Sequence, residues 1–270
     1  MNSLNSVIRR FAGAILLTAS ALVCHAESFT PAQALAYRSI TDVHFSPDGT
    51  KLAYVVYSYE WNWQPHLSVL DVATGRSREL TPTGKSERLP QWSPAGNAIA
   101  FLSNRDGATQ VYVMATDESA ASAVTAAKYG VSNFHWSPDG KAIAYLAKGD
   151  DAPPSSSGPQ VADLETDLQR LWVVDPASKT TRRVGVTGYR LGDFQWRSPS
   201  EILIVASDKP AVEEFTDAIY SVAIGDGTVK LVSRPPQPMR GLLISPDGKQ
   251  FAIRSTRANG PNAQIGRAHV

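Results

Sequence analysis

The segment "WSPDGKAIAY", Trp136–Tyr145, decides the fold, because the chain repeats nearly the same ten residues several times. The serines of successive copies, from Ser46 to Ser245, are separated by 47, 44, 61 and 47 residues, and the longest step contains the insertion "KGDDAPPSSSGPQ". Such a period indicates a repeat architecture. The other copies are "FSPDGTKLAY" (Phe45–Tyr54), "WSPAGNAIAF" (Trp92–Phe101), the degenerate "WRSPSEILIV" (Trp196–Val205) and "ISPDGKQFAI" (Ile244–Ile253).

Each repeat predicts four short antiparallel strands. An aromatic or apolar residue ends the first strand, and Ser-Pro-Asp-Gly then forms a hairpin turn in which Pro fixes φ and Gly takes the left-handed conformation. An apolar second strand such as "AIAYLA" follows, then a third such as "LWVVDP" and a fourth such as "VKLVS". Four strands at this period are typical of the blade of a β-propeller, whereas a sandwich has no fixed repeat and a β-helix repeats over far fewer residues. The sequence therefore predicts an all-β fold, an incomplete β-propeller of four four-stranded blades plus half of a fifth.

The first 26 residues predict a secretory signal peptide. "MNSLNSVIRR" carries two arginines and no acidic residue, "FAGAILLTASALV" is a short apolar run, and "CHA" supplies a cleavage site after Ala26. An uncleaved anchor helix is the alternative, although the run is short for a bilayer. Cleavage would also remove Cys24, the only cysteine, so the mature chain would have no thiol for a disulfide or a nucleophile. We expect a periplasmic or secreted protein with no membrane attachment after cleavage.

The charge of the chain is balanced, with 26 basic and 25 acidic residues. A nucleic-acid partner would require a basic face, which this composition does not suggest. We expect neither a nucleic-acid partner nor a cofactor.

The carboxy-terminal end predicts a truncation. The fifth repeat stops after "QFAIRS", halfway through a blade, whereas a propeller closes its ring. The last six residues, "IGRAHV", break the repeat pattern and resemble the translation of a sequencing adapter; a variant loop is the alternative. The predicted division is a signal peptide at 1–26, a partial propeller at 27–264 and a non-native tail at 265–270.

The block "FTPAQALAYRSITDVHFSPDGTKLAYVV", Phe29–Val56, resembles the start of bacterial serine peptidases of the prolyl oligopeptidase family, especially the acylaminoacyl-peptidase and dipeptidyl-peptidase branches. "LSVLDVATGRSRELT" and "SRPPQPMRGLLISPDGK" continue in the same style. The resemblance implies a short helix before the first blade, a peptide or acyl-amino-acid substrate, and a carboxy-terminal α/β-hydrolase domain with a Ser-Asp-His triad. In the intact protein the propeller would gate entry of the substrate and contact that domain. The alternative is a non-catalytic, TolB-like periplasmic propeller for protein–protein interaction.

The chain departs from this family at the catalytic motif. A nucleophile elbow reads G-x-S-x-G, and the nearest string, "GRSRE" at Gly75–Glu79, lacks the second glycine. No catalytic residue can therefore be assigned, and we expect the hydrolase domain to be missing from this chain.

Four residues on predicted loops are candidates for substrate binding. The resemblance to dipeptidyl peptidases suggests that Glu213 and Glu214 bind a substrate amine, since two carboxylates offset one ammonium; a solvated loop is the alternative. Trp61 and Trp63 are candidate contact aromatics, because exposed aromatic residues favour interfaces. Strand parity predicts that these loops and the Asp150–Asp167 insertion share one rim of the propeller, facing peptide or the hydrolase domain.

His44 and His135 occupy the same position in their repeats, with Gln91 and Gln195 at the equivalent positions. A metal site needs three or four converging ligands, and only two repeats offer His here. The pattern therefore favours structural polar residues, and no metal site is predicted.

The absence of a nucleophile elbow predicts that the 270-residue chain hydrolyses no peptide or ester. Purified protein should show no turnover of peptide anilides or nitrophenyl esters above the background rate. Turnover that a serine-directed phosphonate blocks would contradict this prediction.

Overall fold

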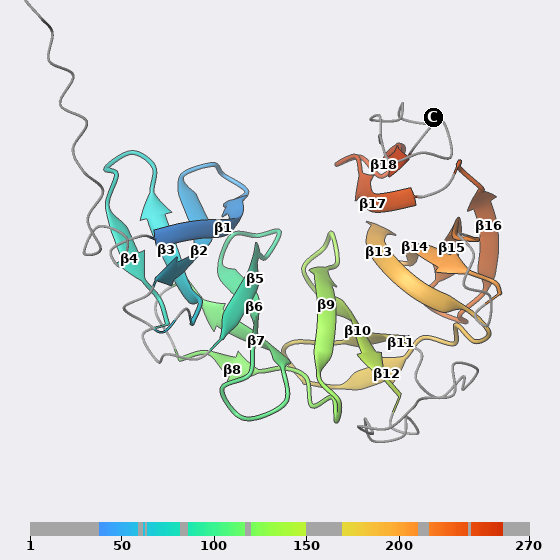
Figure 1. The fold of residues 1–270 in the computed structure, drawn as a ribbon, viewed down its shortest axis with the longest axis horizontal. Coiled ribbons are helices and arrows are strands. Elements are labelled where there is room, and N and C mark those ends of the chain that lie inside the picture. The colour runs from blue at the N-terminus through green and yellow to red at the C-terminus, as the bar shows by residue number, and fades with distance from the viewer. Residues whose placement is uncertain are drawn as a thin grey trace, which may run out of the picture.

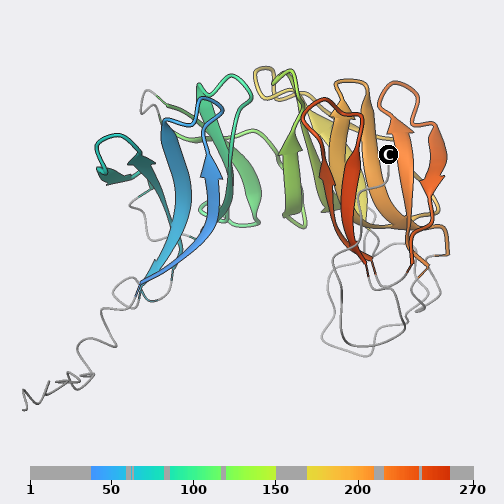
Figure 2. The ribbon, with the colours of Figure 1, turned by 90° about the horizontal axis from the view of Figure 1, so that it is seen from above.

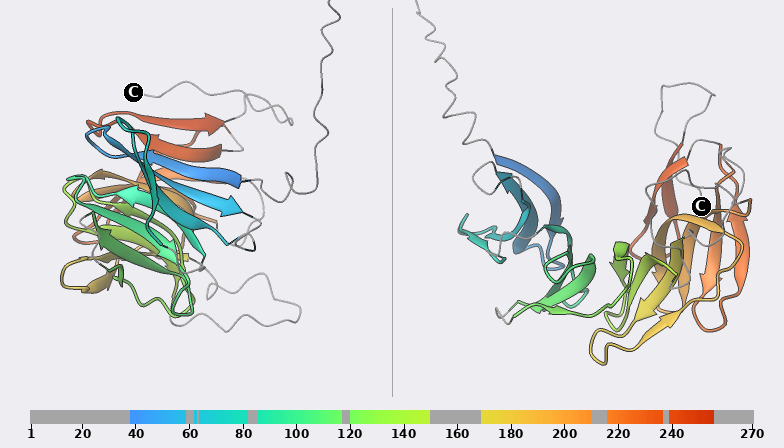
Figure 3. Two further views of the ribbon diagram at one scale, coloured as in Figure 1. Left: turned by 90° about the vertical axis from the view of Figure 1, so that its left-hand side faces the viewer. Right: turned by 60° about the horizontal axis from the view of Figure 1, so that its bottom comes forward.

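The structure, a computed structural model, describes residues 38–58, 62, 64–81, 86–116, 120–149, 169–209, 216–236 and 239–255. These residues form four four-stranded sheets and one two-stranded sheet. The sheets follow one another along an open arc, with the first strand of each sheet on the inside (Figure 1). A view from another direction shows the same succession (Figure 3). The predicted all-β, incomplete propeller is confirmed.

Each sheet is an up-and-down meander in which every strand pairs antiparallel with the next strand of the chain. The arrangement matches the four-strand unit predicted from the repeats. Blades 1 to 4 are the four-stranded sheets in chain order, and blade 5 is the two-stranded sheet. The strands are β1 (Arg38–Phe45), β2 (Lys51–Ser58), β3 (His66–Asp71), β4 (Ser77–Glu79), β5 (Glu87–Trp92), β6 (Ala98–Ser103), β7 (Gln110–Ala115), β8 (Ser122–Ala123), β9 (Val131–Trp136), β10 (Ile143–Lys148), β11 (Gln169–Val174), β12 (Thr181–Arg183), β13 (Arg190–Ser198), β14 (Glu201–Ser207), β15 (Ala218–Ala223), β16 (Val229–Ser233), β17 (Met239–Ile244) and β18 (Phe251–Ser255).

The Ser-Pro-Asp-Gly segments form hairpin turns held by their own hydrogen bonds. In blade 1, Gly49 N–H donates to Ser46 O at 2.8 Å, and the Ser46 hydroxyl donates to the Asp48 carboxylate at 2.6 Å. The hydrogen bond from Ser46, helped by two from Thr50, lowers the pKa of Asp48 to about 2. Gly49 has a φ of 71°, the left-handed conformation predicted for it. The turns of blades 1 and 5 lie on the same rim of the arc (Figure 2).

The degenerate copy in blade 4 forms a tighter turn. Trp196 pairs with Ile202, whereas Trp136 of blade 3 pairs with Ile143, so the blade 4 turn has lost one residue. Arg197 therefore follows the aromatic residue, in the position that Ser137 has in blade 3. The tryptophan, rather than the serine, marks the register of the repeat.

Each junction between blades has its own hydrophobic cluster. Ala144 and Leu146 of β10 pack in the cluster between blades 3 and 4, while their neighbours Ile143 and Tyr145 pack in the cluster between blades 2 and 3. Successive side chains of a strand point to opposite faces of its sheet. Because both faces of an inner blade are covered, its second strand is a nearly continuous apolar run.

A tryptophan hydrogen bond also ties each of the first three junctions. The aromatic or apolar residue that ends the first strand of each repeat is called its marker residue; the marker residues are Phe45, Trp92, Trp136, Trp196 and Ile244. The indole N–H donates to the backbone carbonyl of the residue that precedes the marker residue of the previous blade. The pairs are Trp92 with His44 O at 3.0 Å, Trp136 with Gln91 O at 3.3 Å, and Trp196 with His135 O at 2.9 Å. Blade 5 has Ile244 in this position, so its junction with blade 4 lacks the indole bond.

The hairpin turns of neighbouring blades also contact each other. A Cβ added at Gly96 or Gly140 would lie 3.5 Å from the proline of the preceding turn, Pro47 or Pro94. At Gly248 the approach is much closer, and an added Cβ would lie 2.5 Å from the carbonyl oxygen of Arg197. The side chain of Arg197 in turn donates from Nε to Gly248 O at 3.1 Å. This turn contact provides a link between blades 4 and 5.

Blade 1 exposes the face that no described blade covers. Phe45 is 64% exposed, although the equivalent Trp92 and Trp196 are only 9% and 7% exposed. Ile40 and Val43 on the same strand are 60% and 49% exposed. The aromatic position is therefore buried only where a preceding blade packs against it.

Several sequence predictions lie outside the described residues: the signal peptide, the short helix before the first blade, the Asp150–Asp167 insertion and the tail at 265–270. Within the ranges that the structure describes, no helix is long and apolar enough to cross a membrane.

Gly49 and Gly248 form a matched pair for testing the turn contact, since their φ values are 71° and 70°. Gly49→Ala meets no atom within 4 Å, so it should cost only the left-handed strain of about 1–2 kcal/mol. Gly248→Ala places its Cβ against the Arg197 carbonyl and should destabilise blade 5 more strongly. Hydrogen exchange of the strands that flank each turn, β1 and β2 for Gly49→Ala and β17 and β18 for Gly248→Ala, measures the two losses of protection. Equal losses in the two variants would show that the turns of blades 4 and 5 are not in contact.

Candidate binding site at the propeller axis

The inner strands bring two rings of residues to the axis of the arc. The first ring is the residue that precedes the marker residue of each blade, and the second is the residue three positions before that marker. Members of both rings line one cavity of about 630 Å³, a volume typical of small-molecule and peptide sites. From the first ring the cavity is lined by His44, Gln91, His135, Gln195 and Leu243, and from the second by Leu89, Asn133, Asp193 and Gly241.

β-Bulges change the direction of the backbone at residues of the second ring. The register of β1 with β2 shifts between Thr41 and His44, and that of β5 with β6 shifts between Arg88 and Gln91. Asp42 and Leu89 occupy these bulges with φ values of 51° and 52°. Positive φ is unusual for a bulky residue such as leucine and stores strain. The Asp42 carboxylate accepts a hydrogen bond from Leu89 N–H at 3.2 Å, which joins blade 1 to blade 2 at the axis.

His135 is the centre of the first ring. Its Nδ1 lies 3.3 Å from Gln91 Nε2, and its Nε2 lies 3.3 Å from Gln195 Nε2. Gln91 Nε2 also donates to Phe134 O at 2.8 Å. The imidazole packs edge-on against Phe194, with ring centroids 5.1 Å apart. One histidine therefore connects blades 2, 3 and 4.

The axis disfavours charge on His135 and on Asp193. Burial, reinforced by the nearby His44, lowers the pKa of His135 to about 4, so its ring is neutral near pH 7. Burial also raises the pKa of the Asp193 carboxyl, although hydrogen bonds from the backbone of Phe194 and Leu242 oppose this shift. Phe194 N–H donates to Asp193 Oδ1 at 2.8 Å. A ring of amides and a neutral imidazole offers hydrogen bonds without a strong charge preference.

The opposite wall of the cavity is apolar and comes from blade 5. Leu243 projects from β17 and is 69% exposed. The cavity thus combines a polar wall, suited to backbone amides or hydroxyl groups, with a wall suited to aliphatic side chains. The apolar wall is formed mainly by Leu242, Leu243, Ala252 and Ile253.

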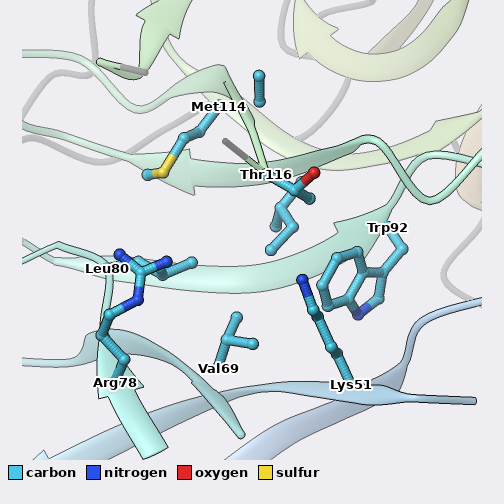
Figure 4. Close-up of a pocket in the computed structure, with 9 residues that line it drawn as sticks. Lys51, Val69, Arg78, Leu80, Trp92, Met114 and Thr116 are labelled. Atoms are coloured by element: carbon cyan, nitrogen blue, oxygen red, sulfur yellow. The ribbon is translucent and has the colours of Figure 1, made fainter. Parts of the chain in front are cut away.

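A second hollow, between blades 1 and 2, is too small for a ligand. Its volume is about 30 Å³, enough for about one water molecule. Figure 4 shows Lys51 beside Trp92, with Met114 and Arg78 also at the edge of the gap. We interpret it as a packing gap at a blade junction.

A buried ion pair near this junction is also structural. The fully buried Glu87 carboxylate pairs with Arg105, which stacks over the Tyr112 ring at 4.7 Å. Burial raises the pKa of Glu87, and hydrogen bonding to Thr81 and the charge of Arg105 offset part of that shift. Glu87 and Arg105 both belong to blade 2, and the hydrogen bond between Glu87 and Thr81, at the end of blade 1, joins the neighbouring blades.

The site residues predicted from the sequence, Trp61, Trp63, Glu213 and Glu214, lie outside the described residues. β2, β10 and β14 all run away from the rim that carries the hairpin turns (Figure 2). In the sequence, Trp61 and Trp63 follow β2, the Asp150–Asp167 insertion follows β10, and Glu213 and Glu214 follow β14. The shared-rim hypothesis stays a prediction.

The sequence did single out His44, Gln91, His135 and Gln195 as equivalent, but the interpretation of them as merely structural missed their common cavity. It also missed Asn133 and Asp193. Each lies three residues before the tryptophan of its repeat, and this shared position could have identified them. In the described part of the chain, no group of three or more His, Cys, Asp or Glu side chains could hold a metal ion.

The low pKa of His135 predicts a pH-dependent stability. An unfolded histidine titrates near pH 6.5 and the folded one at about 4, so the unfolded state binds more protons between these values. Wild-type stability should therefore fall as the pH is lowered from 6.5 to 4, and His135→Gln should lack this part of the dependence. Urea unfolding at several pH values, with the NMR titration midpoint of His135, measures it. A midpoint near 6.5 would contradict the buried, neutral state.

Comparisons with known proteins agree with the fold and with the resemblance drawn from the sequence. Residues 38–156 match the model of the PD40 family, the TolB beta propeller domain. Over 98 residues the chain is 38% identical to the uncharacterized peptidase YuxL of Bacillus subtilis, covering 35% of this chain and 15% of that protein.

Two solved structures illustrate the two kinds of relative. The acylaminoacyl peptidase of Pyrococcus horikoshii superposes with a TM-score of 0.57 and 15% identity, over 81% of this chain and 35% of that one. TolB of Acinetobacter baumannii superposes with a TM-score of 0.55 and 15% identity, over 84% of this chain and 65% of that one. The chain thus spans about a third of the solved peptidase and less of the curated one.

At this identity the superpositions show the fold alone, and the fold is shared by peptidase propellers and by TolB. The sequence match to a peptidase is evidence beyond the shared fold. The predicted resemblance of this chain to the propeller portion of prolyl oligopeptidase-family peptidases is confirmed.

Proposed function

We propose that this chain is the propeller portion of a secreted serine peptidase of the prolyl oligopeptidase family, acting on peptides or acyl-amino acids. The observation that carries the proposal is the sequence match to a peptidase, which adds to a fold shared with other propellers. In this role the propeller admits the substrate and forms one side of a cleft, while an α/β-hydrolase domain supplies the catalytic triad. The signal-like residues 1–26 support export to the periplasm or the exterior.

The axial cavity supports a role in admitting peptides. Its polar wall carries amides that can pair with a peptide backbone, and its apolar wall can accept aliphatic side chains. A substrate chain would contact this cavity on its way to the cleft. In this proposal, contacts to the peptide or to the hydrolase domain come from the loops that carry Trp61, Trp63, Glu213 and Glu214. Glu213 and Glu214 bind the free amine of the peptide.

A TolB-like role in protein–protein interaction is the second candidate. The match of residues 38–156 to the TolB beta propeller model favours it. In this role the same axial cavity would hold a segment of a partner protein, and no catalytic domain would be required.

The gene sequence beyond the codon for Gln264 separates the two candidates. The peptidase proposal expects a following α/β pattern that contains G-x-S-x-G, and the protein encoded by the whole reading frame should be labelled by a serine-directed phosphonate. Replacing the serine of that motif by alanine should abolish labelling. A reading frame that ends after further propeller repeats would overturn the peptidase proposal and favour the TolB-like role.

A further inference from the structure

The hydrogen bonds around His135 fix which of its nitrogens carries the proton. Gln91 Nε2 donates one hydrogen to Phe134 O, at 2.8 Å, and faces His135 Nδ1 with the other, at 3.3 Å. His135 Nδ1 must therefore be an acceptor. A neutral imidazole has one N–H group, so that hydrogen is on Nε2.

This tautomer fixes the amide of Gln195 as well. Two N–H groups cannot face each other favourably, so Gln195 presents its oxygen to His135 Nε2–H. The two ends of a glutamine amide have nearly the same shape, and the hydrogen-bond partners decide which end faces which group. The amide of Gln195 is therefore assigned in the flipped orientation, with Oε1 in the position, 3.3 Å from His135 Nε2, described above for Gln195 Nε2.

The two glutamines are then left with opposite free groups. Gln91 uses both hydrogens of its amide within the protein, and its Oε1 has no hydrogen-bond partner in the described residues. Gln195 uses its oxygen and keeps both amide hydrogens. Both side chains line the axial cavity, so the cavity contains a free acceptor on blade 2 and a free donor on blade 4.

We infer that Gln91 and Gln195, held in opposite orientations by His135, bind the backbone amides of a peptide in the axial cavity. Gln91 Oε1 accepts a hydrogen bond from a peptide N–H, and Gln195 Nε2 donates to a peptide carbonyl. The inference rests on the proposed function, in which the propeller admits peptides, and it names the residues that recognise the peptide. This site reads the backbone, whereas the apolar wall from blade 5 contacts the side chains.

The site is selective for a chain that offers both donors and acceptors. An anion gains little, because Gln91 presents an oxygen and His135 is neutral. The charged and titratable groups around the cavity are His44 on β1, Asp193 on β13 and Arg254 on β18. Asp193 accepts hydrogen bonds from Phe194 N–H and the Leu242 backbone. His44 and Arg254 also line the cavity, so the variants that test the site change the two glutamines and leave these groups in place.

The test titrates the 270-residue chain at pH 7.5 with N-acetyl-penta-alanine amide, and follows binding by NMR. Gln91→Met and Gln195→Met should each weaken binding about tenfold, which corresponds to about 1.4 kcal/mol. Gln195→Glu retains an oxygen toward His135 but removes the amide donor, so it should bind as weakly as Gln195→Met. Gln250→Met, at an exposed position after the blade 5 turn, is the matched control and should bind like wild type.

The outcomes separate this inference from the proposed function. Wild-type binding that the three axial variants leave unchanged would overturn the glutamine site and leave peptide admission standing. No wild-type binding would overturn both. Recovery of binding in Gln195→Glu would mean that Gln195 acts only by supporting His135. The ¹⁵N shifts of His135 give an independent check, since a proton on Nδ1 would overturn the assigned orientations.

Discussion

The structure depends on a hydrogen bond from a tryptophan indole to a backbone carbonyl of the preceding blade. The indole fills the junction with apolar surface and donates its N–H to a carbonyl of the preceding blade, as Trp196 does to His135 O. A buried indole N–H without a partner would cost about 1–3 kcal/mol. The bond also fixes the position of the next inner strand relative to the previous one. At the first three junctions this repeated contact aligns the inner strands that carry His44, Gln91, His135 and Gln195 to the axis.

The apolar core is correspondingly divided among the junctions. Each cluster contains side chains of two neighbouring blades, such as Leu203 of blade 4 with Ile253 of blade 5. In such repeat-like assemblies, stability is a sum of terms from individual modules and their interfaces. The exposed Phe45 shows what a blade loses without a preceding neighbour. The junction of blades 4 and 5 lacks the indole and relies on the turn contact between Arg197 and Gly248 instead.

The local parts of this structure could be predicted from the sequence, because local chemistry determines them. Pro and Gly specify the turn after Trp136, and the run from Ile143 to Ala147 specifies a buried strand. The axial site could not be predicted in the same way. Its geometry requires residues of several blades to converge, and that convergence depends on the curvature of the arc. The positive φ of Leu89 has no sequence signal either, since leucine does not favour that conformation. The loops that carry the predicted contact residues lie outside the described ranges, so those assignments stay predictions.

The acceptor of each indole bond is a main-chain carbonyl, and this has an evolutionary consequence. Any residue at the position before the marker provides that carbonyl, and the chain itself uses His44, Gln91 and His135 as acceptors. The indole bond is thus independent of which side chains face the axis. Mutation can alter the lining of the axis one blade at a time while the indole bonds persist. An architecture of this kind can acquire a new ligand without first losing its stability.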